Sequence, residues 1–113
     1  MQVQETHFLG NGYTWNIPVA SHRREIVIPL LLAYAPGHKS KAYHKVILNG
    51  GKVAEASARG GLASGGISIS ATDFQVWSGF IEANQAVTLQ VTSETGDGGK
   101  TPSGVTVLIG NAG

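Results

Sequence analysis

The tripeptide Gly99-Lys100-Thr101 has the residue types that end a phosphate-binding P-loop. That motif needs a glycine five positions before Gly99 and a helix after the threonine, because loop N–H groups at the start of a helix hold the phosphates. Here Glu94 occupies the glycine position and Pro102 follows the threonine. The sequence therefore predicts no nucleotide site.

The sequence also lacks the motifs of nucleophilic catalysis and of catalysis by paired carboxylates. Ser64 lacks the G-x-S-x-G frame of a hydrolase, since Leu62 stands at the first glycine position. The seven acidic residues are spread singly, and the spacing of Asp73 and Glu82 does not predict a shared cleft. We expect no catalytic residues and no enzymatic activity.

Metal sites are also not indicated. His38 and His44 flank a lysine-rich turn without a nearby carboxylate, and Asp97 lacks the acidic series of a calcium-binding loop. His44 shares its alternation with Ala42 and Val46, so we expect it to point inward as a hydrogen-bonded structural histidine. We expect neither a metal nor a cofactor.

Composition narrows the class of protein. The 113 residues suit one domain, only 13% of them are charged, and 16 are glycine, which favours short strands and tight turns. The net charge of +1 includes no basic run, so we expect no nucleic acid partner. No signal peptide and no run of about 18 apolar residues is visible, which predicts a soluble protein made in the cytoplasm, with no membrane contact.

Period-two patterns predict an all-β fold, an antiparallel sandwich of about eight strands over residues 1–113. In Ala86–Thr92 apolar and polar residues alternate, which is typical of a strand with one buried face. Asn49-Gly50 is a preferred type I′ turn and predicts a hairpin. The expected strands are Tyr13–Val19, Glu25–Tyr34, Ala42–Leu48, Lys52–Ala58, Ile67–Ser70, Asp73–Phe80, Ala86–Thr92 and Val105–Ile109.

The segment Glu25–Tyr34 is apolar on both faces, so its outer side needs a cover. Loops or the N-terminal segment can supply it, or a subunit interface can. Pro29 cannot donate to a ladder, which predicts an edge, a bulge or a bend there. On the interface hypothesis, the residues in a trimer contact are Ile26, Ile28, Leu30, Leu32 and Tyr34.

The aromatic residues are few, and large amphipathic rings are frequent at interfaces. They either pack in the core or form a platform for a ligand. On the second hypothesis the partner-binding residues are Phe8, Tyr13, Trp15 and Trp77.

The chain resembles the compact jelly roll of the tumour-necrosis-factor-like family. The resemblance rests on eight short strands, a glycine-rich middle and a final apolar strand, Val105–Gly110, near the C-terminus. The segment Asp73–Val91 is similar to the strand, turn and apolar strand that precede the last strand of such domains. Where the family has a Gly-Asp turn, this chain has Asn84-Gln85, which departs from the pattern.

This resemblance implies a homotrimer, since such domains occur as trimers in bacteriophage capsid decoration (cement) proteins and tail-fibre heads. The function expected is a non-enzymatic virion structural protein, assembled in the host cytoplasm, that binds and stabilises a phage head. Its expected partners are copies of itself and the major capsid protein or another virion protein. Adhesion would use the exposed loops and Met1–Asn11, which we interpret as an extended N-terminal arm. The alternative is a glycan-binding lectin or a receptor-binding tail-fibre head.

Overall fold

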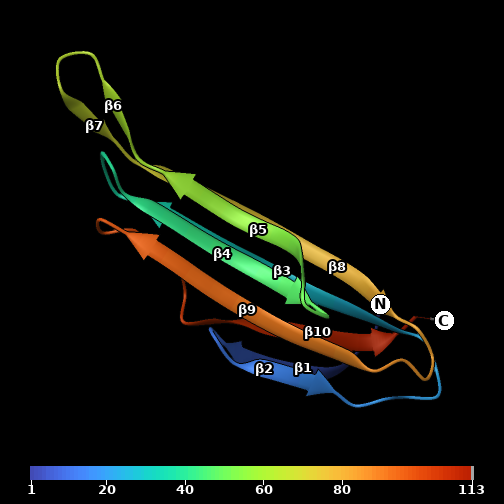
Figure 1. The fold of residues 1–113 in the computed structure, drawn as a ribbon. Helices are drawn as coiled ribbons and strands as arrows, with labels where there is room; N and C mark the ends of the chain where they lie inside the picture. Colours follow the sequence, from blue (N-terminus) through green and yellow to red (C-terminus); the bar gives the residue numbers. More distant parts are fainter. Residues whose placement is uncertain (113) are drawn as a thin grey trace.

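The computed structural model describes residues 1–112, which form an all-β sandwich measuring 60 × 23 × 19 Å. Two four-stranded antiparallel sheets pack face to face, and a small hairpin extends from one end (Figure 1). Sheet A contains, in spatial order, β1 (Val3–Gly10), β10 (Gly104–Asn111), β3 (Arg24–Ala35) and β8 (Ala71–Ile81). Sheet B contains β2 (Thr14–Ile17), β9 (Val87–Gly96), β4 (Lys41–Leu48) and β5 (Gly51–Arg59).

The strands pair in a nested order. β1 pairs with β10, β2 with β9, β3 with β8 and β4 with β5, so the first half of the chain is matched against the second half. The pairs β10–β3 and β4–β9 then complete the two sheets. This is the order of a jelly roll, in which one long folded ribbon wraps into two facing sheets. The predicted all-β jelly-roll sandwich is confirmed.

The core lies between the sheets and follows strand alternation. Val87, Leu89 and Val91 of β9 point inward and are buried, whereas Thr88 is exposed, as the sequence predicts. The largest fully buried side chains come from both sheets: Ile26, Ile28, Leu31, Ile81, Val107, His44, Val46, Leu89 and Val91.

The β4–β5 hairpin is also confirmed. Asn49 and Gly50 join the two strands with φ angles of 49° and 82°. Positive φ at both positions is the requirement of a type I′ turn, and asparagine and glycine tolerate it best. The side chain of Asn49 additionally accepts a hydrogen bond from the Thr88 N–H of β9 at 2.9 Å.

A β-bulge at Pro29 divides β3 into two halves of opposite parity. The register with β8 shifts between Ile28 and Leu31, so two residues of β3 stand opposite one of β8. Before the bulge, Ile26 and Ile28 face the core, and after it Leu31 does. Of the edge, bulge or bend expected at Pro29, the structure has the bulge.

The N-terminal segment is a strand of the sandwich and not a free arm. Residues 3–10 form β1 along the edge of sheet A, where Leu9 is buried opposite Val105. Its apolar residues are too few for a clear period-two pattern, which is why the sequence did not predict it. Its hydrogen bonds to β10 hold it in place.

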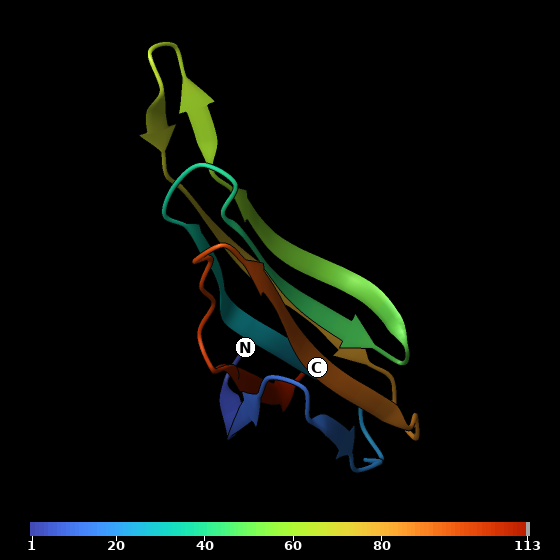
Figure 2. The same ribbon diagram turned by 60° about the vertical axis from the view of Figure 1, so that its left-hand side comes forward.

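The glycine-rich segment after β5 contains a second hairpin. β6 (Gly61–Ala63) pairs with β7 (Ile67–Ile69) and with no other strand, and the pair projects beyond the end of both sheets (Figure 2). The expected strand Ile67–Ser70 therefore belongs to this hairpin instead of the sandwich. Leu62, Ile67 and Ile69 are exposed on it, by 54%, 63% and 48%.

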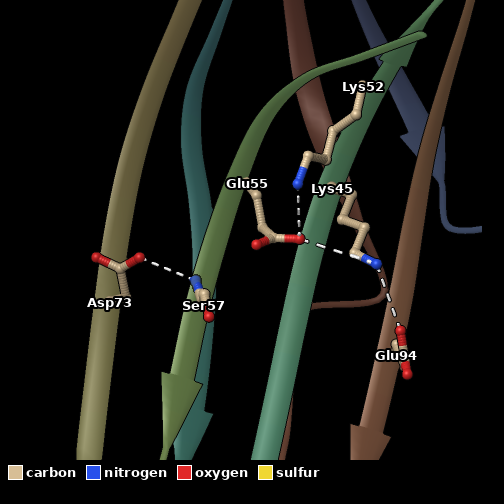
Figure 3. Close-up of polar contacts among 6 residues, drawn as sticks. All are labelled: Lys45, Lys52, Glu55, Ser57, Asp73 and Glu94. Atoms are coloured by element: carbon tan, nitrogen blue, oxygen red, sulfur yellow. Dashed lines mark hydrogen bonds and ion pairs between the residues drawn. The ribbon is translucent and has the colours of Figure 1, made fainter.

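One side of the sandwich is closed by a side chain. The Asp73 carboxylate of β8 accepts the backbone N–H of Ser57 at 2.9 Å, across the gap between the edge strands β8 and β5 (Figure 3). β5 is the last strand of sheet B, and a free edge N–H is a template for pairing with another chain. Asp73 therefore blocks part of that edge and ties the two sheets together.

Candidate interaction surface

The outer face of sheet A is covered by apolar side chains from all four strands. Outward positions alternate with core positions along each strand, and the register sets the outward ones side by side. Val27 lies between Leu108 of β10 and Ser78 of β8, and Leu32 lies beside Phe74. We call this set the apolar face: Phe8, Val27, Leu30, Leu32, Tyr34, Phe74, Val76, Phe80 and Leu108.

These side chains are strongly exposed in the single chain. Val76 is 69% exposed, Phe74 63%, Phe8 62% and Phe80 50%. Isolated apolar residues are normal on protein surfaces, but contiguous patches of large ones mark interaction sites. The apolar face spans the whole width of a sheet, so it is a candidate for contact with another molecule.

Charge is nearly absent from this face. Of the outward strand positions of sheet A, all within the described residues, Glu25 alone carries a charge. It lies at one end, beside Phe80, and the Arg23 guanidinium stacks over the Phe80 ring at 4.0 Å while pairing with Glu82 at 2.9 Å. These charged groups lie together at one end of the face and leave its centre apolar.

The outer face of sheet B has the opposite character. Lys45 lies 3.8 Å from Glu55 and 3.4 Å from Glu94, and Lys52 lies 3.5 Å from Glu55, so charges alternate across three strands (Figure 3). Exposed pairs of this kind stabilise little, but they keep a face hydrated. The two outer faces therefore differ: that of sheet B carries charged side chains, and that of sheet A exposes apolar ones.

The predicted interface residues divide between the core and this face. Leu30, Leu32 and Tyr34 are on the apolar face, Leu30 45% and Tyr34 38% exposed. Ile26 and Ile28 are fully buried between the sheets, so their placement in an outer contact is wrong. The cause is the bulge at Pro29, which reverses the strand's parity.

The four predicted partner-binding aromatics do not come together. Phe8 is on the apolar face, and Tyr13, 73% exposed, lies in the β1–β2 connection. Trp15 stacks on His7 with ring centroids 3.8 Å apart, and Trp77 packs on the core opposite Ile28. Both tryptophans are partly buried packing residues and do not form an open platform.

Sequence reasoning missed the exposed residues of β8. Phe74, Val76 and Phe80 occupy every even position but one between 74 and 80, and that period-two signal was available. Alternation alone does not tell which side of β8 faces the core, because its register with β3 decides this by pairing Gln75 with the buried Leu31 and Phe74 with Leu32.

One histidine lies away from both outer faces. His44 is buried in the core, and desolvation lowers the pKa of its imidazole. Within residues 1–112, no three His, Asp or Glu side chains lie together as a metal site would need, and no helix suited to crossing a membrane occurs there. Compared with known proteins, the chain matches no family model and no curated protein sequence.

Proposed function

We propose that this chain is a non-enzymatic structural subunit that associates with copies of itself through the apolar face. The observation that carries the proposal is the exposure of Phe8, Phe74, Val76 and Phe80 on a sheet face whose outward strand positions include one charged residue, Glu25. Burying such side chains removes apolar area from water at about 25 cal/mol per Å².

The size of the face suits self-association. Four strands at about 4.8 Å spacing and about nine residues at about 3.3 Å rise cover roughly 600 Å² in projection. Because the side chains protrude, the accessible area of the face is larger than this projection and approaches the roughly 800 Å² that each partner buries in a standard interface. Copies of the same chain are the occupants we propose, because an apolar sheet face is complementary to itself in both shape and polarity.

The order of the assembly and its setting rest on the family resemblance. Tumour-necrosis-factor-like jelly rolls occur as homotrimers, and phages use them as capsid decoration proteins. We therefore propose a trimer, assembled in the host cytoplasm, that binds the major capsid protein or another protein of a virion and stabilises the particle. Because three copies bind together, the apparent affinity of the trimer for the particle exceeds that of one subunit.

The contact with the particle requires a surface that stays free in the trimer. The β6–β7 hairpin projects past both sheets (Figure 2), and its Leu62, Ile67 and Ile69 are exposed. A two-stranded hairpin is only marginally stable alone, and docking adds the burial that it lacks. We assign the particle contact to this hairpin and not to the N-terminal segment, because that segment forms β1 and is paired with β10 in sheet A.

The experiment that tests the proposal has two stages. Light scattering after size-exclusion chromatography gives the solution mass, and a mass of three chains is expected at micromolar concentration. Co-sedimentation with phage heads that lack their decoration protein then measures binding. A monomer at every concentration would overturn the self-association, and a trimer that binds no particle would overturn the virion role while leaving the assembly intact.

A further inference from the structure

Arg24 is a buried cation without a partner. It begins β3, its side chain points between the sheets, and the residue is 8% exposed. Its Nε and Nη2 atoms are buried and make no hydrogen bond, and none of the ion pairs within residues 1–112 includes it. The neighbouring Arg23, by contrast, is half exposed and pairs with Glu82.

This arrangement is unfavourable for the free protein. Arginine stays protonated at any accessible pH, so it cannot shed its charge on burial as a lysine can. A buried charge without a counter-charge is unfavourable, even after the protein relaxes around it. An anion bound beside Arg24 would offset this cost.

Arg24 lines a cavity of about 420 Å³ at the end of the sandwich. Pro18 and Val19, from the connection between β2 and β3, and Ile109 give it an apolar side. The polar groups along it, from three segments, are Gln4, Glu5, His22 and Asn111. Its volume is within the range of about 300–1,000 Å³ that small-ligand sites occupy.

We propose that this cavity binds a small organic acid of monosaccharide size, with its carboxylate on Arg24. Nε–H and Nη2–H lie on one edge of the guanidinium and point in parallel, at the spacing of the two oxygens of a carboxylate. In the structure this edge is buried, so the proposal includes a rotation of the terminal side-chain bonds that turns it to the cavity. The apolar side accommodates the carbon skeleton, and Gln4, His22 and Asn111 offer hydrogen bonds to hydroxyl groups.

Glu5 also lines the cavity, and its charge makes a distinct prediction. No ion pair within 4 Å joins it to Arg24 in the described chain, so the two charges are not in direct contact. Its carboxylate repels an acid bound beside it. Removing that charge therefore favours the ligand, whereas removing a true counter-ion would destabilise the protein.

The first experiment titrates the protein with glucuronate and, as the matched neutral sugar, glucose. The two differ at C6, where one has a carboxylate and the other a CH₂OH group. Heteronuclear NMR follows the Nε–H resonance of Arg24, assigned by its absence in Arg24→Met. We expect a saturable shift with glucuronate, a weaker one with acetate and none with glucose. Equal responses to glucose, a response to phosphate but not to glucuronate, or none at all would overturn the proposal.

Variants separate a binding site from a structural arginine. Arg24→Met should lower glucuronate affinity at least about tenfold, the factor expected for one charge-assisted contact, and leave the free protein as stable or more so. Arg23→Met, the control, should keep the affinity. Glu5→Gln, a surface change that serves even if Arg24→Met fails to fold, should tighten glucuronate binding several-fold. Unchanged or weaker binding in Glu5→Gln would contradict the proposal, and these results do not depend on trimer formation.

Discussion

The backbone N–H of Leu32, just past the bulge of β3, donates to Nδ1 of His44 across the core at 3.4 Å. The bulge interrupts the ladder with β8, and an unpaired N–H buried there would be costly. With Nδ1 as acceptor, the proton of the neutral imidazole is on Nε2, which donates to Asn11 Oδ1 at 3.0 Å. Asn11 in turn donates to the Pro102 carbonyl at 2.6 Å. One histidine thus connects β4 to the bulge and to two loops.

This network predicts acid sensitivity. Burial lowers the pKa of His44 below its ordinary value of 6.5, so the unfolded chain takes up the proton first as the pH falls. The contribution of His44 to stability is complete above pH 6.5 and declines as the pH drops towards the folded-state pKa. Urea unfolding at pH 8, 6 and 5 should show this decline. It should be smaller in His44→Gln and unchanged in His38→Gln, whose histidine is exposed. Identical pH profiles for the two variants would contradict the assignment.

The turn between β4 and β5 allows a test of backbone conformation. Gly50→Ala places a Cβ at φ 82°, which should cost about 1 kcal/mol of unfolding free energy. Gly51→Ala is the matched control, because Gly51 is not at positive φ and an added Cβ would meet only the Leu48 carbonyl at 3.7 Å. Denaturant unfolding of both variants measures the difference. Equal losses would show that positive φ is not the constraint.

The same turn illustrates what sequence reasoning can reach. Local rules succeed where neighbouring residues decide the structure: Asn49-Gly50 selects the hairpin, and alternation places Val87, Leu89 and Val91 in the core. The fold class follows from the same signals, but the strand count of eight agrees only because the unpredicted β1 replaces Ile67–Ser70, which lies in the β6–β7 hairpin. Pro29 indicated an irregularity, and the structure has the bulge there.

The remaining features depend on contacts distant in sequence. Whether Pro29 marks a bend or a bulge decides which of Ile28 and Leu30 faces out, and only the pairing with β8 decides it. β1 forms because β10, about 100 residues later, offers it an edge. The burial of the unpartnered Arg24 also could not be predicted from the sequence, since an arginine at the start of a strand is ordinarily hydrated.

Asp73 gives a prediction about the edge of sheet B. Asp73→Ala leaves the Ser57 N–H without its 2.9 Å acceptor, and about 1 kcal/mol of stability should be lost. Amide hydrogen exchange at Ser57 should become faster, while Lys45 in the neighbouring strand keeps its protection. Asp73→Asn is the control, since its amide oxygen can still accept the bond. Unaltered exchange at Ser57 in the alanine variant would mean that the contact does not protect the edge.

The apolar face gives the most direct test of assembly. In Val76→Lys a charge replaces the most exposed apolar side chain of β8, and in a symmetric assembly each copy buries it. Because an unpaired charge resists burial, we expect the dissociation constant of the oligomer to rise at least about 100-fold. Thr88→Lys adds the same charge on the exposed face of sheet B and should leave the mass unchanged. Analytical ultracentrifugation over a concentration series measures both. If Val76→Lys retains the wild-type mass and affinity while Thr88→Lys dissociates, copies meet through sheet B, and the role assigned to the apolar face is wrong.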